Sequence, residues 1–241
     1  MGISYQQLSP DSDYSRFSDF DCSYPDVPEY AKDEVRSLSQ YLSHEDGAKN
    51  DLKKGLGVTT VAYVAGEVAG YFTLMAGSVL EARTGADFID RFSFYCITYP
   101  AIKISRFAVD RKYQSIEVEP GLKVSDYMFI ELLSIGDSLA RVRAESWYGD
   151  ALSQDKKHVN NERQERLGIR FVIADALGAK RTLNFYCNRG FKPFKSNEID
   201  YQKMIDEIIA GTYKKPENLK HVGIPLYLDL RKKTRSVRKR K

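Results

Sequence analysis

Cysteine and histidine are scarce in this chain of 241 residues, which has three of each. Cys22, Cys96 and Cys187 are odd in number and far apart, so they do not form the framework of a small disulfide-stabilised protein. No histidine lies near a cysteine or a second histidine at metal-ligand spacing. We therefore expect no metal site, and free thiols are typical of a reducing compartment such as the cytoplasm.

Long apolar runs are missing as well. No stretch approaches the roughly 20 apolar residues of a membrane-spanning helix. The first residues, Met-Gly-Ile-Ser-Tyr-Gln, show neither the basic nor the apolar region of a signal peptide. We therefore expect no membrane association. The hydrophobic share of 42% and the charged share of 29% are those of a globular protein.

Charge is spread unevenly along the chain. Residues 1–100 carry a net charge of −7, residues 101–195 carry +5, and the last eleven residues carry eight basic and no acidic side chains. A run of one sign is typical of a disordered segment that contacts a polyanion. We predict one domain over 1–230, a disordered basic tail over 231–241, and insertions near 80–100, 115–120, 148–166 and 195–220.

Hydrophobic periodicity predicts alternating helices and strands. Two β-branched and aromatic runs on either side of Gly66 predict a β-hairpin over 58–64 and 68–79. Helical spacing predicts helices over 29–41, 49–56, 122–147, 179–188 and 199–209. Further strands are predicted over 3–8, 102–109, 169–174, 191–194 and 224–230, with Pro100 as a break. This order indicates an α/β (α+β) fold with one mixed, twisted central sheet flanked by helices.

The stretch from Ile102 to Met128 organises this prediction. A buried strand leads into a loop that ends at Pro120-Gly121, and a helix follows. The start of a helix leaves backbone N–H groups unpaired, and with the helix dipole these groups suit an anion such as a pyrophosphate. By itself this joint is a weak signal, because many strand–loop–helix joints bind nothing.

Three blocks of sequence, in this order, resemble the GNAT superfamily of acetyl-CoA-dependent N-acetyltransferases. They are Val68–Val79, Ser105–Gln114 with the Gly121 loop and helix, and Ile169–Ala176 followed by Phe185–Phe191. The first two are most similar to the toxins of bacterial toxin–antitoxin modules, which acetylate the α-amine of aminoacyl-tRNA. The resemblance implies acetyl-CoA as co-substrate and acetyl transfer to a primary amine. It also implies tRNA, an antitoxin protein and a second copy of the chain as partners.

The resemblance also assigns roles to single residues. Tyr186, in the block Phe-Tyr-x-x-x-Gly-Phe, is the implied general acid for the departing thiolate. A phenol with a pKa near 10 suits a thiol with a pKa near 8.5. The pantetheine arm would pair with backbone groups of the central strand, and the phosphates would meet the loop that follows it. The implied cofactor-binding residues are Phe107, Ala108, Val109, Gln114, Gly121, Leu122 and Lys123.

The chain departs from the family in this loop. Ser115–Pro120 are inserted, and Lys123 stands where the family has glycine or alanine. Glu117 and Glu119 would repel a phosphate that they faced, whereas Lys123 would attract one. Ala179 replaces the asparagine common at the start of the next helix. Two alternatives therefore stay open: a GNAT that acetylates a protein lysine or a small amine, and a non-catalytic nucleic-acid-binding protein of the same fold.

No general base is identified, since Glu67 lies in a hairpin turn where we expect it to be solvated. Basic side chains flank the predicted site and would follow a tRNA backbone if they converge. They are Arg106, Arg111, Lys112, Lys180, Arg181 and Arg189. The alternative for each is an ordinary solvated surface charge.

Overall fold

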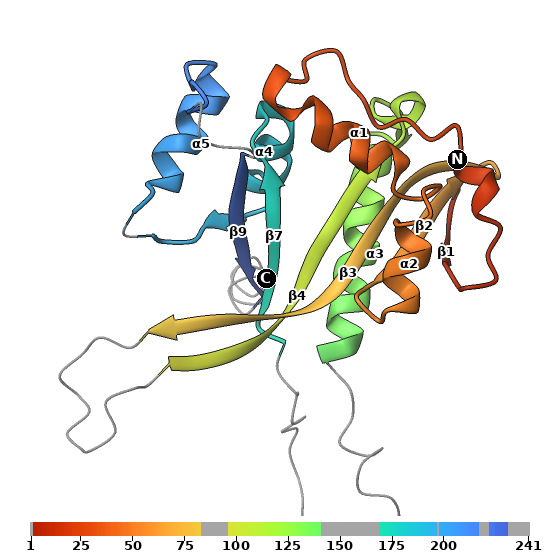
Figure 1. Cartoon of the computed structure of the whole chain (residues 1–241), viewed down its shortest axis with the longest axis horizontal. Helices are drawn as coiled ribbons and strands as arrows, with labels where there is room; N and C mark the ends of the chain where they lie inside the picture. Colours follow the sequence, from red (N-terminus) through yellow and green to blue (C-terminus); the bar gives the residue numbers. More distant parts are fainter. Residues whose placement is uncertain (1, 83–95, 141–168, 197, 217–221, 231–241) are drawn as a thin grey trace, which may run out of the picture.

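The computed structural model of the chain describes residues 2–82, 96–140, 169–196, 198–216 and 222–230 (Figure 1). The predicted insertion over 148–166 and the predicted basic tail lie outside these residues. The elements are β1 (Ile3–Gln7), η1 (Tyr14–Phe17), η2 (Glu29–Ala31), α1 (Lys32–Gln40), α2 (Ala48–Lys53), β2 (Val58–Val64), β3 (Glu67–Ala82), β4 (Cys96–Val109), η3 (Arg111–Tyr113), β5 (Glu117–Glu119), β6 (Leu122–Lys123), α3 (Val124–Ala140), β7 (Phe171–Leu177), α4 (Lys180–Cys187), β8 (Lys192–Pro193), α5 (Tyr201–Ala210) and β9 (Gly223–Asp229).

The described residues form a seven-stranded sheet in the order β1-β2-β3-β4-β7-β9-β8. Only the pair β4 and β7 is parallel, and the other neighbours are antiparallel. Parallel neighbours need a long connection between them, and here α3 belongs to that connection. This mixed sheet with flanking helices confirms the predicted fold class.

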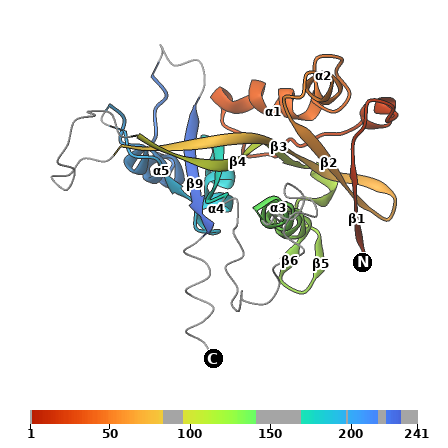
Figure 2. The same cartoon turned by 90° about the horizontal axis from the view of Figure 1, so that it is seen from below.

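Helices cover both faces of the sheet, with α1 and α2 on one face and α3, α4 and α5 on the other (Figure 2). Neighbouring strand residues point to opposite faces, so on β3 Tyr71 packs with the N-terminal segment and Phe72 packs toward α3. Met128 and Leu132 of α3 are fully buried against the sheet. Burying a large apolar side chain contributes roughly 1.5–3 kcal/mol, so both faces hold the central strands in place.

Pro100 does not break the chain as predicted. It lies within β4, opposite Ser78 of β3. The Pro100 carbonyl accepts a hydrogen bond from the Arg170 N–H at 3.1 Å, so it points to the edge of β4 that faces β7. The nitrogen of Pro100 points to the same edge, and β7 starts at Phe171, after the position where it could accept a hydrogen bond from that nitrogen. The missing N–H therefore removes no ladder hydrogen bond, which is the situation that permits proline in a strand.

Close packing fixes β4 beside its neighbours. A Cβ atom added to Gly70 of β3 would lie 2.6 Å from the Ala108 carbonyl oxygen and 2.7 Å from the Met128 sulfur. Only glycine permits that approach of β3, β4 and α3. The inserted segment supplies the first strand of the small β5–β6 hairpin, whose turn uses Gly121 at φ 78°. The hairpin replaces the start of the helix predicted from residue 122.

No helix in the described part of the chain combines the length and the apolar character needed to cross a membrane.

Candidate active site

The central strands part beside a bulge. Residues Ala101–Ile104 of β4 pair with Phe171–Ala174 of β7. Beyond this point β4 continues to Val109 and β7 to Leu177, but the two strands no longer pair with each other. On its other edge, β4 pairs Ile104 and Arg106 with successive residues of β3, which leaves Ser105 as a bulged residue. Backbone groups of β4 beyond the bulge are therefore free of partners on β7. This separation of the two strands leaves open the backbone groups that the resemblance implied for the pantetheine arm, and the bulge had no sequence signal.

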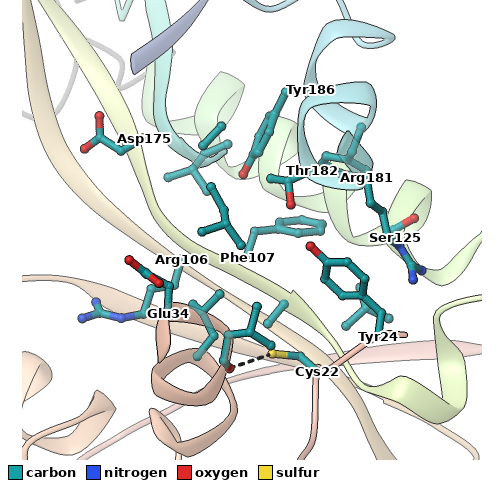
Figure 3. A pocket seen from close by; sticks show the side chains of 18 of the residues that line it. Cys22, Tyr24, Glu34, Arg106, Phe107, Ser125, Asp175, Arg181, Thr182 and Tyr186 are labelled. Atoms are coloured by element: carbon teal, nitrogen blue, oxygen red, sulfur yellow. Dashed lines mark hydrogen bonds between the residues drawn. The ribbon is translucent and has the colours of Figure 1, made fainter. Parts of the chain in front are cut away.

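A cavity of about 740 Å³ opens where β4 and β7 separate. Its walls come from α1, β4, β7, α3, α4 and the segment before α1 (Figure 3). The structure brings together on these walls the following predicted site residues: Arg106, Phe107, Ala108, Val109, Gln114, Lys123, Arg181, Tyr186 and Arg189. The predicted residues Arg111, Lys112, Gly121, Leu122 and Lys180 are exposed and do not line it.

Tyr186 of α4 directs its hydroxyl group into the cavity (Figure 3). The side chain is only 6% exposed, and its ring packs edge-on against Phe185 at 5.2 Å and Phe191 at 5.0 Å. Burial raises the pKa of Tyr186 above its ordinary range, and the charge of Arg189 opposes this shift. The phenol therefore keeps its proton at neutral pH and can donate it.

Arg189 ties α4 to α3 beside this tyrosine. Its guanidinium group lies 3.7 Å from the centre of the Phe185 ring and donates a hydrogen bond to the Phe185 carbonyl at 2.8 Å. It also pairs with the carboxylate of Asp126, which accepts from the Lys123 N–H at 2.9 Å and so caps the start of α3. The charge of Arg189 is thus matched inside the protein.

Gln114 joins three segments at one end of the cavity. Its Nε2 lies 3.0 Å from the Cys22 carbonyl, 3.2 Å from the Ser23 carbonyl and 3.1 Å from the Val109 carbonyl. Its Oε1 accepts a hydrogen bond from Arg181 at 2.8 Å. Arg181 and Lys123 give this end of the cavity cationic donors that suit phosphate oxygens, and the Gln114 amide, held by backbone carbonyls, positions Arg181 there.

Arg106 has internal partners as well. Its guanidinium group contacts the carboxylate of Asp51 at 3.1 Å and lies 3.8 Å from the centre of the Tyr41 ring. Lys112 lies 4.0 Å from Glu67 at the surface. The exposed residues Arg111, Lys112 and Lys180 do not join Arg106 in one cluster of the cavity wall, and a nucleic-acid role for these basic residues stays a prediction.

The segment before α1 and α1 itself supply a wall that the sequence did not reveal. Cys22, Tyr24 and Glu34 line the cavity from this side, and Asp175 and Thr182 were also missed. Burial raises the pKa of the Cys22 thiol to about 11, and this thiol donates to the Val35 carbonyl at 3.6 Å. A protonated, buried thiol is a poor nucleophile, so covalent chemistry on Cys22 is disfavoured.

The arrangement suits acyl transfer. A substrate carbonyl on the open edge of β4 would meet backbone donors, which stabilise a developing oxyanion. The Tyr186 hydroxyl would face the leaving group. Within the described residues, no group of three or more His, Cys, Asp or Glu side chains could hold a metal ion.

Comparison with known proteins places the fold. No protein-family model matches the chain, and no curated protein matches it. Several solved structures do match the chain.

One is the structure of AtaTR, the toxin AtaT with its antitoxin, bound with acetyl-CoA. It is 15% identical to this chain, with a TM-score of 0.57 over 98% of both chains. A structure described as a bacterial toxin is 13% identical, with a TM-score of 0.56 over 99% of this chain and 97% of that one. A tyrosine-to-phenylalanine variant of KacT is 12% identical, with a TM-score of 0.53 over 98% of this chain and 99% of the other. The chain therefore has the GNAT fold in the form found in these toxins.

Proposed function

We propose that this protein transfers the acetyl group of acetyl-CoA to a primary amine, and that the amine is the α-amine of aminoacyl-tRNA. The observation that carries the proposal is the Tyr186 hydroxyl, which faces a cavity formed where β4 separates from β7. The fold of AtaT supports the same reaction, since AtaT was solved with acetyl-CoA. The cavity offers the donor about 740 Å³, open backbone groups along β4, and Lys123 and Arg181 at one end.

In this mechanism the amine nitrogen attacks the thioester carbonyl carbon while backbone N–H groups of β4 bind the oxyanion. The C–N bond forms, the C–S bond breaks, and Tyr186 gives its proton to the departing sulfur. The raised pKa of the phenol is higher than that of a thiol in water, so proton transfer to a thiolate in water would be unfavourable. Burial also raises the pKa of a thiol within the cavity, so the difference between the two pKa values is smaller there than for a thiol in water.

The acceptor is the finer part of the proposal. The basic tail and the exposed residues Arg111, Lys112 and Lys180 favour a polyanionic acceptor such as tRNA. Acetyl-CoA and charged tRNA meet in the cytoplasm, which is where we expect the protein to act. The AtaT toxin was also solved with the C-terminus of its antitoxin AtaR, which supports a protein partner that restrains this activity.

The test uses acetyl-CoA labelled in the acetyl group, aminoacyl-tRNA, and the full chain. We expect label to precipitate with tRNA and to be released by mild base as an N-acetyl-amino acid. Uncharged tRNA is the control and should stay unlabelled. Label on small amines or on protein lysines, with none on charged tRNA, would overturn the acceptor assignment. Absence of label on every acceptor would overturn the enzyme itself.

A second measurement addresses the tail. A chain that ends at residue 230 should retain transfer to a small amine but bind aminoacyl-tRNA more weakly, with a smaller dependence on salt. Equal affinity and equal salt dependence with and without residues 231–241 would contradict a tRNA-binding role for the tail.

A further inference from the structure

The loop between β4 and α3 carries backbone N–H groups that the sequence predicted for a pyrophosphate. In the structure, two of these groups donate to carboxylates of the chain itself. The Gly121 N–H lies 3.1 Å from Oε2 of Glu117, and the Lys123 N–H lies 2.9 Å from Oδ2 of Asp126. A phosphate that bound to either group would take the place of a carboxylate that is already there.

Asp126 is held in this position from two sides. Its other oxygen pairs with the guanidinium group of Arg189 on α4, and only 25% of the Asp126 side chain and 19% of the Arg189 side chain are exposed. The next N–H group, that of Val124, donates to the Ile116 carbonyl at 3.3 Å and closes the base of the β5–β6 hairpin. A diphosphate that displaced Asp126 would break the ion pair, and one that bound beside it would be repelled by its charge.

Asp126 also has a structural role. Acidic residues in the first turn of a helix interact favourably with the helix dipole, and Asp126 lies in the first turn of α3. Asp200 stabilises the start of α5 in a similar way, since it accepts from the Lys203 N–H at 3.0 Å. The two aspartates differ in one respect, because Asp126 lines the cavity and Asp200 lies outside its wall. Asp200 therefore provides a control that has the structural role alone.

Side chains remain for the phosphates at this end of the cavity. Figure 3 shows Arg181 of α4 at the same end as Ser125 of α3, and Lys123 also lines the cavity. Arg181 contacts the neutral Gln114 side-chain oxygen at 2.8 Å and the Tyr24 ring, whose centre lies 5.2 Å away. Arg181 and Lys123 are both exposed. Water weakens ion pairs of exposed groups, so each contact should change the affinity by about tenfold at most.

The pantetheine arm of the donor meets a more buried surface. Beyond Ile104, β4 no longer pairs with β7, and its residues Phe107, Ala108 and Val109 line the cavity. Ala108 is buried, and the Phe107 ring packs against the Phe185 ring at 5.0 Å. Backbone hydrogen bonds in such a place are shielded from water and are stronger than those at the surface. The arm therefore has the stronger contacts, and the phosphates have the weaker ones.

We propose that the protein recognises its donor through the pantetheine thioester and not through the adenosine diphosphate, so that S-acetyl-pantetheine is a second acetyl donor. This inference rests on the proposed acetyl transfer. Glu117 and Asp126 keep the phosphates away from the backbone of the loop, and Arg181 and Lys123 hold them from the surface. The β5–β6 hairpin thus sets the range of donors.

The reacting atoms are the same for both donors. The amine nitrogen forms the C–N bond with the acetyl carbon, and the C–S bond breaks. Tyr186 protonates the sulfur, so pantetheine leaves as a free thiol. The proton that the nitrogen loses on forming the amide returns to the Tyr186 phenolate, so the enzyme is unchanged after each turnover.

The first test compares the two donors, each labelled in the acetyl group, with aminoacyl-tRNA as acceptor. We expect kcat/KM for S-acetyl-pantetheine to lie no more than about 100-fold below that for acetyl-CoA, since two exposed contacts are lost. In the double variant Arg181→Gln, Lys123→Gln, this difference should almost disappear. The double variant Lys192→Gln, Lys195→Gln removes the same charge outside the cavity wall and should keep the wild-type difference.

The second test measures the binding of CoA and of pantetheine to Asp126→Asn and Asp200→Asn by titration calorimetry. An asparagine oxygen accepts the same hydrogen bond, so both variants keep the start of their helix. Asp126→Asn should tighten CoA binding about 3- to 10-fold, because a negative charge near the phosphates is removed, and should leave pantetheine binding unchanged. Asp200→Asn should bind both ligands as the wild type does.

Three results would overturn the inference and leave the proposed function intact. The first is a loss with S-acetyl-pantetheine that is larger than about 100-fold. The second is a difference between the donors that persists in the Arg181→Gln, Lys123→Gln variant. The third is an Asp126→Asn protein that binds CoA and pantetheine in the wild-type ratio, which would mark Asp126 as a helix cap alone. If acetyl-CoA labels no acceptor, the proposed function fails, and the calorimetry still decides how CoA is recognised.

Discussion

Two buried tyrosines lie on opposite sides of the central sheet and differ in what their hydroxyl groups meet. Tyr71 of β3 is fully buried, packs against the rings of Phe20 at 5.3 Å and Tyr41 at 5.6 Å, and donates its hydrogen to a backbone carbonyl. Tyr186 is almost as buried, but its hydroxyl faces the cavity. Burial raises the pKa of both phenols. A perturbed pKa therefore does not identify a catalytic group here, and the direction of the hydroxyl decides between structure and chemistry.

The same contrast extends to the two sides of the cavity. On the side of α3 and α4, the Tyr186 hydroxyl faces the cavity, where a donor would lie. On the side of α1, the hydroxyl groups of Tyr71, Tyr30 and Ser39 bind backbone carbonyls. The Tyr186 hydroxyl is therefore placed to meet a substrate, whereas the hydroxyl groups of Tyr71, Tyr30 and Ser39 hold α1 and the segment before it in place.

The largest expected effect comes from removing one hydroxyl group on each side. Tyr186→Phe should lower kcat for acetyl transfer roughly 10²- to 10⁴-fold, because a general acid is lost, while the stability changes little. Tyr71→Phe should leave kcat close to the wild-type value and lower the free energy of unfolding by about 1 kcal/mol, because the Leu38 carbonyl loses one of its two donors, the other being the Tyr41 N–H. Steady-state kinetics and urea unfolding of both variants measure this. A Tyr71→Phe enzyme as slow as Tyr186→Phe would abolish the distinction between the two sides.

The second effect concerns the cationic end of the cavity. Arg181→Gln should weaken acetyl-CoA binding about 10-fold, since a charge-assisted hydrogen bond to phosphate is worth roughly 1.5–3 kcal/mol. Titration calorimetry gives the Kd directly. Lys192→Gln, an exposed charge on β8 outside the cavity wall, is the control and should bind as the wild type does. Unchanged affinity in Arg181→Gln would move the phosphate site elsewhere.

A smaller effect is expected from Arg106, which the sequence placed among the nucleic-acid contacts. Its ion pair with Asp51 and its contact with the Tyr41 ring are half-buried, so Arg106→Gln should lower stability by about 1 kcal/mol. Binding of aminoacyl-tRNA should be unaffected. Weaker tRNA binding at unchanged stability would contradict this structural role and return Arg106 to the acceptor site.

The smallest effect is an alkaline one. Burial raises the pKa of Tyr5 to about 12, with further contributions from Glu131 and Tyr127. Such a tyrosine ionises near pH 10 in the unfolded chain and only later in the folded one, so its contribution to stability is complete below pH 10 and is lost as pH rises toward 12. Urea unfolding at pH 8, 10 and 11 should show this decline, and Tyr5→Phe should make it shallower. Stability that rises with pH in this range would contradict the assignment.

The sequence predicted the side of the site that is built from contiguous segments. Apolar, mostly β-branched residues recur along 102–109, which predicted the central strand. The turn at Gly66 predicted the hairpin, and the block around Tyr186 predicted a helix followed by the aromatic residue Phe191. Each of these signals depends on neighbours in the chain, which local periodicity can report.

The rest could not be predicted, because it depends on contacts between distant segments. The register of β4 against β3 creates the bulge at Ser105, and no local pattern encodes that register. Glu34 was placed on a helix, but the face that it presents is decided by how α1 packs on Tyr71, 37 positions along the chain. The prediction that Pro100 breaks the chain was wrong for the same reason. Whether β4 can contain a proline at this position depends on where the neighbouring strand β7 begins.

The side chain of Gln114 has a consequence for how the protein responds to its ligands. One amide connects the segment before α1, the end of β4 and the first turn of α4. A phosphate that draws Arg181 toward itself removes a hydrogen bond from that amide, and the change reaches the Cys22 and Ser23 carbonyls on the opposite wall. Donor and acceptor affinities are then linked, and linkage is reciprocal, so measuring either affinity with the other substrate present reports the same coupling constant.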